Sequence, residues 1–382
     1  MKIGIAGGGP AGLYFALLMK KLKAAHEIRL LEQNSANATY GWGVVFSDRA
    51  VSFLENSAPD FHHDIKSNLE IWDKLVILHK GQPVAIDGSV FSGISRIQLL
   101  HILHEHCRRR GVELQFETRL ADPAIFSDCD LIVGADGVSS FVRQKYSAFF
   151  QPSLELRSNK YIWYLTPRLF DALSLIFREN QDGVFVAHAY RYNQTTSAFI
   201  VECDAATWKK AGLASMSDTE SRTYCEKVFE KDLHGHPLLS NKSIWINFVV
   251  VRNRRWHHDN VVLIGDALRT VHFSIGSGTR TAFEDAIALA GAFERHGEDV
   301  HAALQRFENI RKPSADRLLE VAQKSVAWYE NMRCLMHLHP IAFAYDYMMR
   351  GGKVDHESLR RKAPKFIAAY EAYAGPAGKT AI

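Results

Sequence analysis

The alternation of apolar and polar residues predicts a strand, a helix and a second strand in the first 32 residues of the chain. Residues 2–6 are a mostly apolar run that begins at Lys2, and residues 27–31 form a second strand-like run. The apolar-rich stretch between them, which starts at Pro10, predicts a helix. This order of elements indicates a βαβ unit with parallel strands.

Between residues 40 and 133, the pattern predicts a loop, a hairpin, a helix and two more strands. The glycine-rich segment 40–48 breaks any regular period and predicts a loop. A hairpin is expected over residues 75–86, and a helix over residues 96–110. Apolar residues at 112–116 and 130–133 predict two more strands.

The character of the chain changes between residues 155 and 255, where short aromatic and β-branched segments follow one another. These segments predict strands at 160–165, 173–178, 183–190, 197–202 and 245–251. A polar helix is expected at 217–231, because residues 217–220 form an N-terminal capping pattern. We therefore expect a separate sheet rather than another βαβ unit.

The last third of the chain is predicted to add a strand and helices to the nucleotide-binding domain that the first part of the chain begins. Residues 260–266 are almost entirely apolar, as a buried parallel strand requires. The stretch 278–347 is helical by period, with Pro313 expected to interrupt it, and residues 375–382 are expected to fray. The resulting division is a discontinuous nucleotide-binding domain (1–154 and 256–350), a β-sheet lobe (155–255), and a C-terminal helix and tail (351–382).

Composition narrows the class of protein. Of the 382 residues, 47% are hydrophobic and 23% are charged, and the formal net charge of +4 gives no indication of nucleic-acid binding. No run reaches the roughly 18 apolar residues needed to span a bilayer, and the apolar start is too short for a secretory signal. The five cysteines are scattered without a C-x-x-C pair, which argues against disulfides and a metal site. We expect a cytoplasmic monomer or homodimer.

The loop after the first strand carries glycines at the spacing of a dinucleotide-binding turn. Gly7 permits the tight turn, Gly9 lets the backbone approach a pyrophosphate, and Gly12 lets the helix pack closely on the strand. Glu32 stands 20 residues beyond Gly12, where a carboxylate accepts hydrogen bonds from a ribose. The neighbouring positions that complete the predicted cofactor-binding segment are Pro10, Ala11 and Gln33.

Two further segments, together with this motif, resemble a known family. One is the run GADGVSSFVR at residues 134–143, and the other joins Gly-Asp-Ala at 265–267 to Gly-Ser-Gly at 276–278. In this order and over most of the chain, they resemble the class A flavoprotein aromatic hydroxylases. The resemblance implies an α/β fold: an FAD-binding, Rossmann-like three-layer domain of the glutathione-reductase type, with an inserted β-sheet substrate lobe and C-terminal helices.

Departures from the common family pattern narrow the resemblance. Arg269 and Phe273 occupy positions where the widespread form of the third segment has a histidine and a proline. This variant, with residues 41–45 and 188–190, is similar to the branch that contains salicylyl-CoA 5-hydroxylase, the hydroxylase half of 2-aminobenzoyl-CoA monooxygenase/reductase and the violacein-pathway tryptophan-derivative hydroxylase. Residues 9–16 and 46–48 favour the aryl-CoA members, and in a chain of 382 residues we expect no reductase barrel.

The resemblance also implies a reaction. It implies a single-component monooxygenase that binds FAD, takes electrons from NADH or NADPH bound transiently, and uses O2. In such enzymes a flavin C4a-hydroperoxide hydroxylates an activated aromatic ring. The substrate implied first is an aryl-CoA thioester such as salicylyl-CoA, hydroxylated at position 5. A tryptophan-derived indole or a free aromatic acid stays open as the alternative.

The same resemblance assigns cofactor roles to residues outside the glycine turn. Arg96 would neutralise pyrophosphate charge, and Asp136 belongs to the segment that serves both the flavin and the nicotinamide. Asp266 would accept hydrogen bonds from the ribityl chain. The remaining candidates are amides at a helix start that would meet the pyrimidine edge of the flavin: Gly276, Gly278 and Thr279.

Three side chains are candidates for a catalytic proton acceptor. His188 and Tyr190 stand two residues apart on one predicted strand, so they share a face that would cover the flavin. His272 lies in the loop expected to contact the flavin. An imidazole is a suitable base near neutral pH, yet histidine and tyrosine on a half-buried strand are more often packed without a catalytic role.

Other polar clusters support weaker hypotheses. The histidines at 101, 104 and 106 resemble a metal-binding set, but only the first two face together on a helix, so a solvated surface is expected. Basic runs at 108–110, 252–255 and 360–362 could bind phosphates of CoA or of the nicotinamide donor. The run 252–255 is favoured among them, because it lies near the predicted domain junction.

Two rival classes of flavin or nucleotide protein are also open. A flavoprotein that does not hydroxylate, such as an ene-reductase or a halogenase, is one of them, but the halogenase motif W-x-W-x-I-P is not continued at residues 245–247. An ordinary NAD-dependent dehydrogenase is the other. It would use the glycine turn and leave the segments at 134–143 and 265–278 unexplained.

Overall fold

The computed structural model describes residues 1–38, 41–241 and 243–375, and its first sheet is six-stranded and almost entirely parallel. The strand order is β15-β16-β9-β1-β2-β8, in which only the β15–β16 pair is antiparallel. The strands are β1 (Lys2–Ala6), β2 (Glu27–Leu31), β8 (Glu113–Gln115), β9 (Leu131–Gly134), β15 (His257–His258) and β16 (Val261–Leu263). The predicted βαβ unit and return strand are confirmed, because β1 pairs in parallel with β2 and β9 pairs in parallel with β16.

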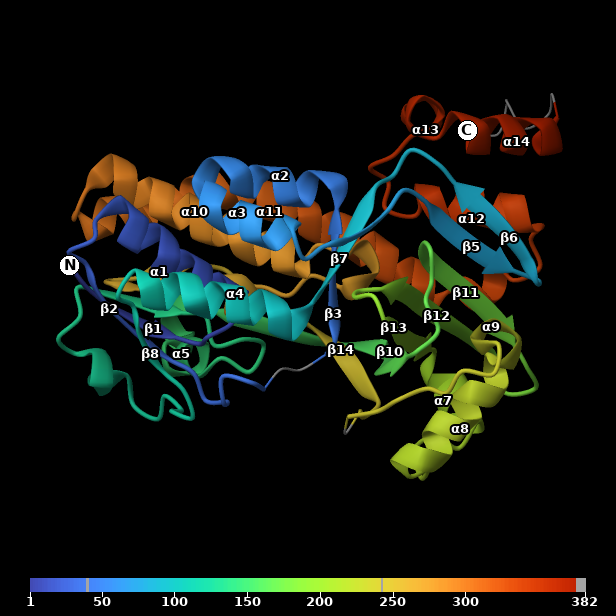
Figure 1. The fold of residues 1–382 in the computed structure, drawn as a ribbon, viewed down its shortest axis with the longest axis horizontal. Helices are drawn as coiled ribbons and strands as arrows, with labels where there is room; N and C mark the ends of the chain where they lie inside the picture. Colours follow the sequence, from blue (N-terminus) through green and yellow to red (C-terminus); the bar gives the residue numbers. More distant parts are fainter. Residues whose placement is uncertain (39–40, 242, 376–382) are drawn as a thin grey trace.

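Helices pack on this sheet and share one hydrophobic core with it (Figure 1). α1 (Pro10–Leu22) connects β1 to β2, and all its residues from Pro10 to Met19 are buried. α1 packs against α4 (Arg96–Arg109) and α10 (Gly278–His296), and α10 packs against α11 (Val300–Glu330). α1 is therefore covered on all sides, which explains its apolar sequence. Shorter helices complete this part: α2 (Asp48–Ser57), α3 (Pro59–Lys66), α5 (Phe141–Lys145) and α6 (Ser147–Phe150).

The second sheet has seven strands in the order β14-β10-β13-β12-β11-β5-β6. The strands are β5 (Leu75–His79), β6 (Gln82–Ile86), β10 (Pro152–Thr166), β11 (Leu173–Glu179), β12 (Val184–Arg191), β13 (Ser197–Cys203) and β14 (Ile246–Asn253). The predicted strands of this region and the predicted hairpin of β5 and β6 are confirmed. The hairpin joins this sheet through a parallel pair with β11, although its residues precede the predicted lobe by some 70 positions.

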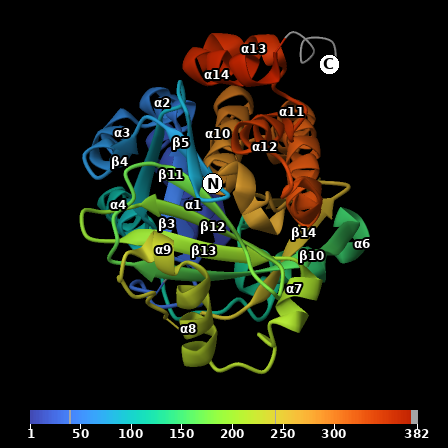
Figure 2. The same ribbon diagram turned by 90° about the vertical axis from the view of Figure 1, so that its right-hand side faces the viewer.

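Helices cover both faces of the second sheet (Figure 2). On one face lie α7 (Ala205–Lys210), α8 (Asp218–Val228) and α9 (Glu230–Leu233), and the predicted capping pattern at Ser217 is confirmed as a capping box. On the other face lie the end of α11 and the helices α12 (Pro340–Met349), α13 (His356–Lys362) and α14 (Pro364–Ala374). The C-terminal helices therefore belong to the same half of the molecule as the β-rich sheet.

A third, small sheet corrects one expectation. It has the order β3-β7-β4, with β3 (Gly43–Ser47), β4 (Glu70–Trp72) and β7 (Phe91–Ser95). The prediction of a loop over 40–48 is wrong for 43–47, because this segment pairs antiparallel with β7; residues 39 and 40 lie outside the described residues. A Cβ at Gly43 would lie 2.7 Å from the Tyr192 side chain, so the glycine serves close strand packing rather than a turn.

The prediction that Pro313 interrupts the C-terminal helical region is also wrong. α11 runs without a break from Val300 to Glu330, with Pro313 inside it. A proline removes one backbone hydrogen bond, but the surrounding turn is fixed by Arg311, which is buried and paired with Glu284 and Asp285 on α10. Tertiary contacts therefore outweigh the local preference of the proline.

The histidines of α4 are not a solvated face. His104 and His106 are each only 3% exposed, whereas His101 is exposed. His104 packs edge-on against Phe116, and burial lowers the pKa of His104 to about 4. The Nε2 atom of His106 lies 2.7 Å from a carboxylate oxygen of Asp64. Among the residues that the structure describes, no group of three or more potential ligands is placed to hold a metal ion.

Candidate functional site

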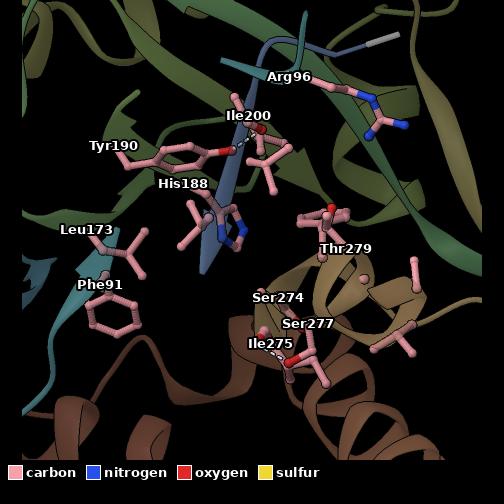
Figure 3. A pocket seen from close by; sticks show the side chains of 18 of the residues that line it. Phe91, Arg96, Leu173, His188, Tyr190, Ile200, Ser274, Ile275, Ser277 and Thr279 are labelled. Atoms are coloured by element: carbon pink, nitrogen blue, oxygen red, sulfur yellow. Dashed lines mark hydrogen bonds between the residues drawn. The ribbon is translucent and has the colours of Figure 1, made fainter. Parts of the chain in front are cut away.

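A cavity of about 540 Å³ lies between the two halves of the molecule. One side is the loop wall, which we define as the segments 9–11 and 265–279; residues 9–11, 265, 266, 271 and 273–279 of these segments line the cavity. The opposite side is the sheet wall, formed by His188, Tyr190 and Ile200 of β12 and β13. Figure 3 shows His188 and Tyr190 of β12 across the cavity from the loop that carries residues 274–279, with Arg96 at one end of the view and Phe91 at the other.

The glycine turn shapes the start of the loop wall. Gly7 has φ +105°, and a Cβ there would lie 2.2 Å from the carbonyl oxygen of Ala135. A Cβ at Gly12 would lie 2.3 Å from the carbonyl oxygen of Gly7. A Cβ at Gly9 would meet no protein atom within 4 Å, and Gly9 lines the cavity. Gly7 and Gly12 thus serve the packing of the turn, whereas the space beside Gly9 is left for a ligand.

The N-terminus of α1 opens onto this space. Gly9 is the N-cap residue and supplies no side chain to the free amides of the first turn, and Pro10 begins the helix. Pro10 and Ala11 line the cavity with Gly9. α1 has 13 residues, and its uncapped N-terminus faces the cavity. Such a helix end is a suitable site for the phosphates of a dinucleotide.

The acidic residue at the end of β2 is held beside the glycine turn. One carboxylate oxygen of Glu32 accepts a hydrogen bond from the Gly8 amide at 2.7 Å, and the other accepts from the Asn34 amide at 2.8 Å. Gln33 is exposed. Neither Glu32 nor Gln33 lines the cavity, so the structure places neither side chain inside it.

A buried ionic cluster fixes the second part of the loop wall. Asp285 of α10 is fully buried and accepts hydrogen bonds from the Gly265 amide at 3.0 Å, Arg269 at 2.5 Å and Arg311 at 3.0 Å. The guanidinium of Arg269 also lies 5.0 Å from the ring centroid of Trp256. The arginine that replaces the usual histidine of the third motif therefore ties this loop to α10.

The loop presents Asp266 to the cavity. Its side chain lies deep in the molecule but is exposed to the cavity, which Arg96 also lines. Burial raises the pKa of Asp266, and the positive charges of Arg96 and Arg269 oppose this rise. Burial lowers the pKa of Arg96, and Asp266 opposes that change. The two predicted cofactor residues Arg96 and Asp266 therefore line the same cavity, and each charge influences the pKa of the other group.

A second uncapped helix N-terminus adjoins Asp266. α10 begins at Gly278, and its N-cap residue Ser277 makes no side-chain capping hydrogen bond. Gly276, with φ +58°, Gly278 and Thr279 all line the cavity. A Cβ at Gly278 would meet no protein atom within 4 Å, as at Gly9. The amides at this end of α10 are placed to meet a ligand in the same cavity.

Asp136 has a local structural partner. Its carboxylate accepts hydrogen bonds from the amides of Phe141 at 2.7 Å and Val142 at 3.1 Å, so it holds the first turn of α5. Asp136 does not line the cavity, but its neighbours Ala135 and Gly137 do. The structure therefore places the backbone of this segment, rather than the aspartate side chain, at the cavity.

His188 is the candidate base that best combines position and support. It is 5% exposed and lines the cavity, and its Nε2 atom lies 3.3 Å from a carboxylate oxygen of Glu202. Glu202 is 1% exposed and accepts a second hydrogen bond from Asn159 at 2.8 Å. Burial alone would raise the pKa of Glu202, but the hydrogen bonds from His188 and Asn159 and the proximity of His272 bring the pKa below its usual value. A buried carboxylate that does not line the cavity therefore fixes the orientation of the imidazole.

Sequence reasoning did not identify Glu202. The signal was present, since Glu202 is the one acidic residue of the otherwise apolar run Ser197–Cys203. In the sheet, Glu202 pairs with Val186 and Ile200 pairs with His188, so the carboxylate and the imidazole are diagonal neighbours on one face. Only the register of β12 against β13 makes this neighbourhood visible.

The other two catalytic candidates have different surroundings. Tyr190 lines the cavity, but its hydroxyl donates a hydrogen bond to the Gly43 carbonyl at 3.0 Å, and burial raises its pKa well above the usual value. His272 does not line the cavity. Its ring stacks on Phe273 at a centroid distance of 4.2 Å, and its Nδ1 atom lies 2.8 Å from the Ser274 hydroxyl. The structure thus brings His188 and Tyr190 together and keeps His272 behind Phe273.

The basic runs are distributed over different places. Arg252 and Arg254 border a second cavity of about 530 Å³ that shares no residue with the first. Of the run 360–362, Lys362 lines the first cavity. The run favoured from sequence therefore lies away from the predicted cofactor site, whereas a run that was not favoured reaches it. Among the described residues, no helix has the length and apolar character to cross a membrane.

Comparisons with known proteins find related sequences over most of the chain. A family model described as an FAD binding domain matches residues 1–322. The chain is 36% identical to salicyloyl-CoA 5-hydroxylase from Streptomyces sp, over 92% of this chain and 70% of the relative. It is 35% identical to protodeoxyviolaceinate monooxygenase from Chromobacterium violaceum, over 92% of this chain and 94% of that protein. It is also 35% identical to a 3-hydroxy-4-methyl-anthranilyl-[aryl-carrier protein] 5-monooxygenase from Streptosporangium sibiricum, over 94% of this chain and 97% of that protein.

Solved structures share the fold at low sequence identity. 2-Methyl-3-hydroxypyridine-5-carboxylic acid oxygenase superposes with a TM-score of 0.70 and 18% identity, over 94% of this chain and 95% of that chain. p-Nitrophenol 4-monooxygenase from Pseudomonas putida superposes with a TM-score of 0.73 and 16% identity, over 98% of both chains. The predicted arrangement of a nucleotide-binding sheet with an attached β-rich sheet is thereby confirmed.

Proposed function

Because the chain belongs to the FAD binding domain family of class A flavin hydroxylases and is an FAD-dependent aromatic monooxygenase using NAD(P)H and O2, we propose that it hydroxylates an arylcarboxylate held as a CoA thioester. Salicylyl-CoA, hydroxylated at position 5 with NADH as donor, is the substrate we favour. Two relatives are named for arylcarboxylates joined to CoA or to an aryl-carrier protein, which supports this choice.

The residues of the loop wall fit FAD. FAD, when bound, would pass electrons from NAD(P)H to O2 and so activate one oxygen atom of O2 for transfer to the ring. We assign the pyrophosphate to the N-terminus of α1 at residues 9–11, where Gly9 leaves open space, and its charge to Arg96. Asp266 would accept hydrogen bonds from the ribityl chain, and the amides of residues 276–279 would hold the pyrimidine edge, since these residues line the same cavity. Glu32, which holds the Gly8 amide beside the glycine turn, would bind the adenosine ribose.

The observation that carries the proposal is the His188–Glu202 pair in the sheet wall. The carboxylate accepts a hydrogen bond from the Nε2–H group, so Nδ1 is the imidazole nitrogen available as a proton acceptor. In our proposal, Nδ1 takes the proton from the ring hydroxyl or amino group of the substrate, which makes the ring electron-rich. The negative charge of Glu202 stabilises the imidazolium that forms. The aromatic side chains of Phe273 and Tyr329 pack against His188 and exclude water from the site.

A second candidate has its own supporting observation. Arg350 lines the cavity and donates hydrogen bonds to Ser325 and to the carbonyls of Tyr347 and Ser274, with no carboxylate partner among the described residues. Such a guanidinium could bind the carboxylate of a free aromatic acid. The similarity to protodeoxyviolaceinate monooxygenase keeps a tryptophan-derived indole in consideration as well.

Anaerobic stopped-flow measurement of flavin reduction tests the proposal. NADH and NADPH are each mixed with the holoenzyme alone and with salicylyl-CoA, anthraniloyl-CoA, salicylate or tryptophan. We expect an aryl-CoA thioester to accelerate reduction most, and product analysis to find a ring-hydroxylated thioester. Acceleration by salicylate alone would assign the site to free acids through Arg350, and acceleration by none of the four would contradict the proposed substrate class.

A further inference from the structure

The cavity continues beyond the sheet wall to the surface. We call this continuation the outer end, and its residues come from the loop before β7, from β11 and from the C-terminal helices. They are Ser89, Phe91, Leu173, Met348, Val354 and Lys362. The outer end is mostly apolar, and it finishes at an exposed lysine. A free monocyclic acid held beside His188 would leave this part of the cavity empty.

The rim of the outer end carries unpaired positive charge. Lys362, and the exposed Lys353 next to Val354, have no hydrogen-bond or ion-pair partner among the described residues. The nearby carboxylates are already engaged. Asp355 caps α13 by accepting from the Ser358 amide at 2.7 Å, and Asp87 accepts from the Phe366 amide at the start of α14 at 3.1 Å. The rim is therefore complementary to an anion from outside the chain.

Tertiary packing builds the rim rather than leaving it loose. A Cβ at Gly88 would lie 1.5 Å from the carbonyl oxygen of Lys362, so the loop before β7 touches the backbone at the end of α13. Asp87, one residue earlier, holds the first turn of α14. These contacts hold Lys362 close to Ser89, although the two residues are more than 270 positions apart in the sequence.

We propose that the outer end binds the phosphopantetheine arm of a CoA thioester, with the apolar walls around the pantetheine chain and Lys362 at the phosphates. This inference rests on the proposed function, since it requires an arylcarboxylate thioester with its ring beside His188. The shape of the cavity supports it: the ring region and the exposed lysine are joined by a continuous lining. A slender apolar chain that ends in phosphate matches both the lining and the charge of its rim.

The test compares salicylyl-CoA with the salicylyl thioester of N-acetylcysteamine, which has the same ring and thioester but no phosphate. Lys362→Glu reverses the charge at the rim, and Lys365→Glu is the matched control, because Lys365 is exposed on α14 outside the cavity lining. We expect Lys362→Glu to raise the Kd of salicylyl-CoA roughly tenfold and to leave the Kd of the truncated thioester within about twofold. Lys365→Glu should change neither value. Added salt should weaken binding of salicylyl-CoA only.

A second variant tests the apolar part of the outer end. Val354→Trp fills the passage between the ring region and Lys362. We expect it to lose salicylyl-CoA turnover while retaining wild-type flavin content and a wild-type rate of flavin reduction by NADH in the absence of substrate. Equal effects of Lys362→Glu on both thioesters, or no effect on either, would overturn the inference and leave the proposed function intact. A wild-type enzyme that hydroxylates no thioester would overturn the proposed function itself.

A carrier-protein thioester distinguishes the source of the arm. It shares the phosphopantetheine chain with CoA but lacks the adenosine 3′-phosphate and 5′-phosphate. Turnover of the carrier-bound salicylyl group with rejection of salicylyl-CoA would overturn the assignment to CoA. Turnover of salicylyl-CoA with rejection of the carrier-bound group would support it.

Discussion

The loop wall and the sheet wall of the cavity are built from different parts of the polypeptide. The loop wall offers mainly backbone: open space beside Gly9 and Gly278, and the uncapped N-termini of α1 and α10. The sheet wall offers side chains, with His188 and Tyr190 projecting from β12. Backbone amides suit the phosphates and polar edge of a cofactor, whereas side chains decide which substrate fits and where its proton goes.

The two walls are also held in place differently. The loop wall depends on the ionic cluster around Asp285, which joins Gly265, Arg269 and Arg311. The sheet wall depends on strand register, which brings Glu202 behind His188. Disrupting the first should therefore cost stability and cofactor binding together, and disrupting the second should cost turnover alone.

The largest effect should come from breaking the ionic cluster. Asp285→Ala leaves Arg269 and Arg311 buried without their shared carboxylate, and we expect a loss of about 3–5 kcal/mol in the free energy of unfolding, with loss of bound FAD. Urea unfolding and the flavin absorbance of the purified protein measure both. Glu284→Ala is the control, because Glu284 is partly exposed and pairs with the same Arg311; it should cost only about 1 kcal/mol. A stable, yellow Asp285→Ala protein would show that the loop wall is held by other contacts.

Removing the candidate base should affect turnover without affecting the cofactor. His188→Ala is expected to lower kcat by about 10²–10⁴-fold while flavin content stays at the wild-type level. Glu202→Gln should lower kcat less and move the acid limb of the kcat/KM profile to lower pH, because the imidazolium loses its counter-ion. His272→Gln serves as the comparison, since His272 lies outside the cavity lining. Equal losses in the His188 and His272 variants would refute the assignment of the base.

Lowering the pH should destabilise the loop wall through His272. Burial holds the pKa of His272 at about 4, below its value of 6.5 in the unfolded chain. Between these two values the unfolded state binds more protons, so the contribution of His272 to stability falls as the pH falls. At pH 5 the resulting loss in the free energy of unfolding is about 2 kcal/mol. Urea unfolding at pH 7 and pH 5 should show a smaller difference for His272→Gln than for the wild type; an identical difference would exclude His272 as the source.

The smallest effect should be confined to cofactor affinity. Gly9→Ala adds a methyl group in the open space beside α1, at an ordinary φ of −77°, so the apoprotein should unfold at the wild-type urea concentration. We expect FAD to bind about tenfold more weakly, as isothermal titration of the apoprotein would measure. Gly12→Ala is the contrast, because its Cβ would lie 2.3 Å from the Gly7 carbonyl oxygen and should destabilise the apoprotein itself. Unchanged FAD affinity in Gly9→Ala would place the pyrophosphate elsewhere.

Several features of the fold could be predicted from local patterns. The apolar runs at β1 and β16 predict buried parallel strands, and the capping pattern at Ser217 predicts the start of α8. Two local signals were misleading, because tertiary contacts overrode them. Gly43 serves close packing of β3, and Pro313 lies within a continuous α11 that Arg311 anchors. Local patterns describe a segment well only where its neighbours agree with it.

The chain by itself determined the cofactor side of this protein. Glycine spacing and the segments at 134–143 and 265–278 act through backbone conformation, which depends on residues close together in sequence. Only the tertiary structure decided the substrate side. Glu202 reaches His188 through strand register, and Lys362 reaches the cavity through packing against the loop that follows β6. A side-chain pocket is assembled from distant segments, and no local pattern records which of them will meet.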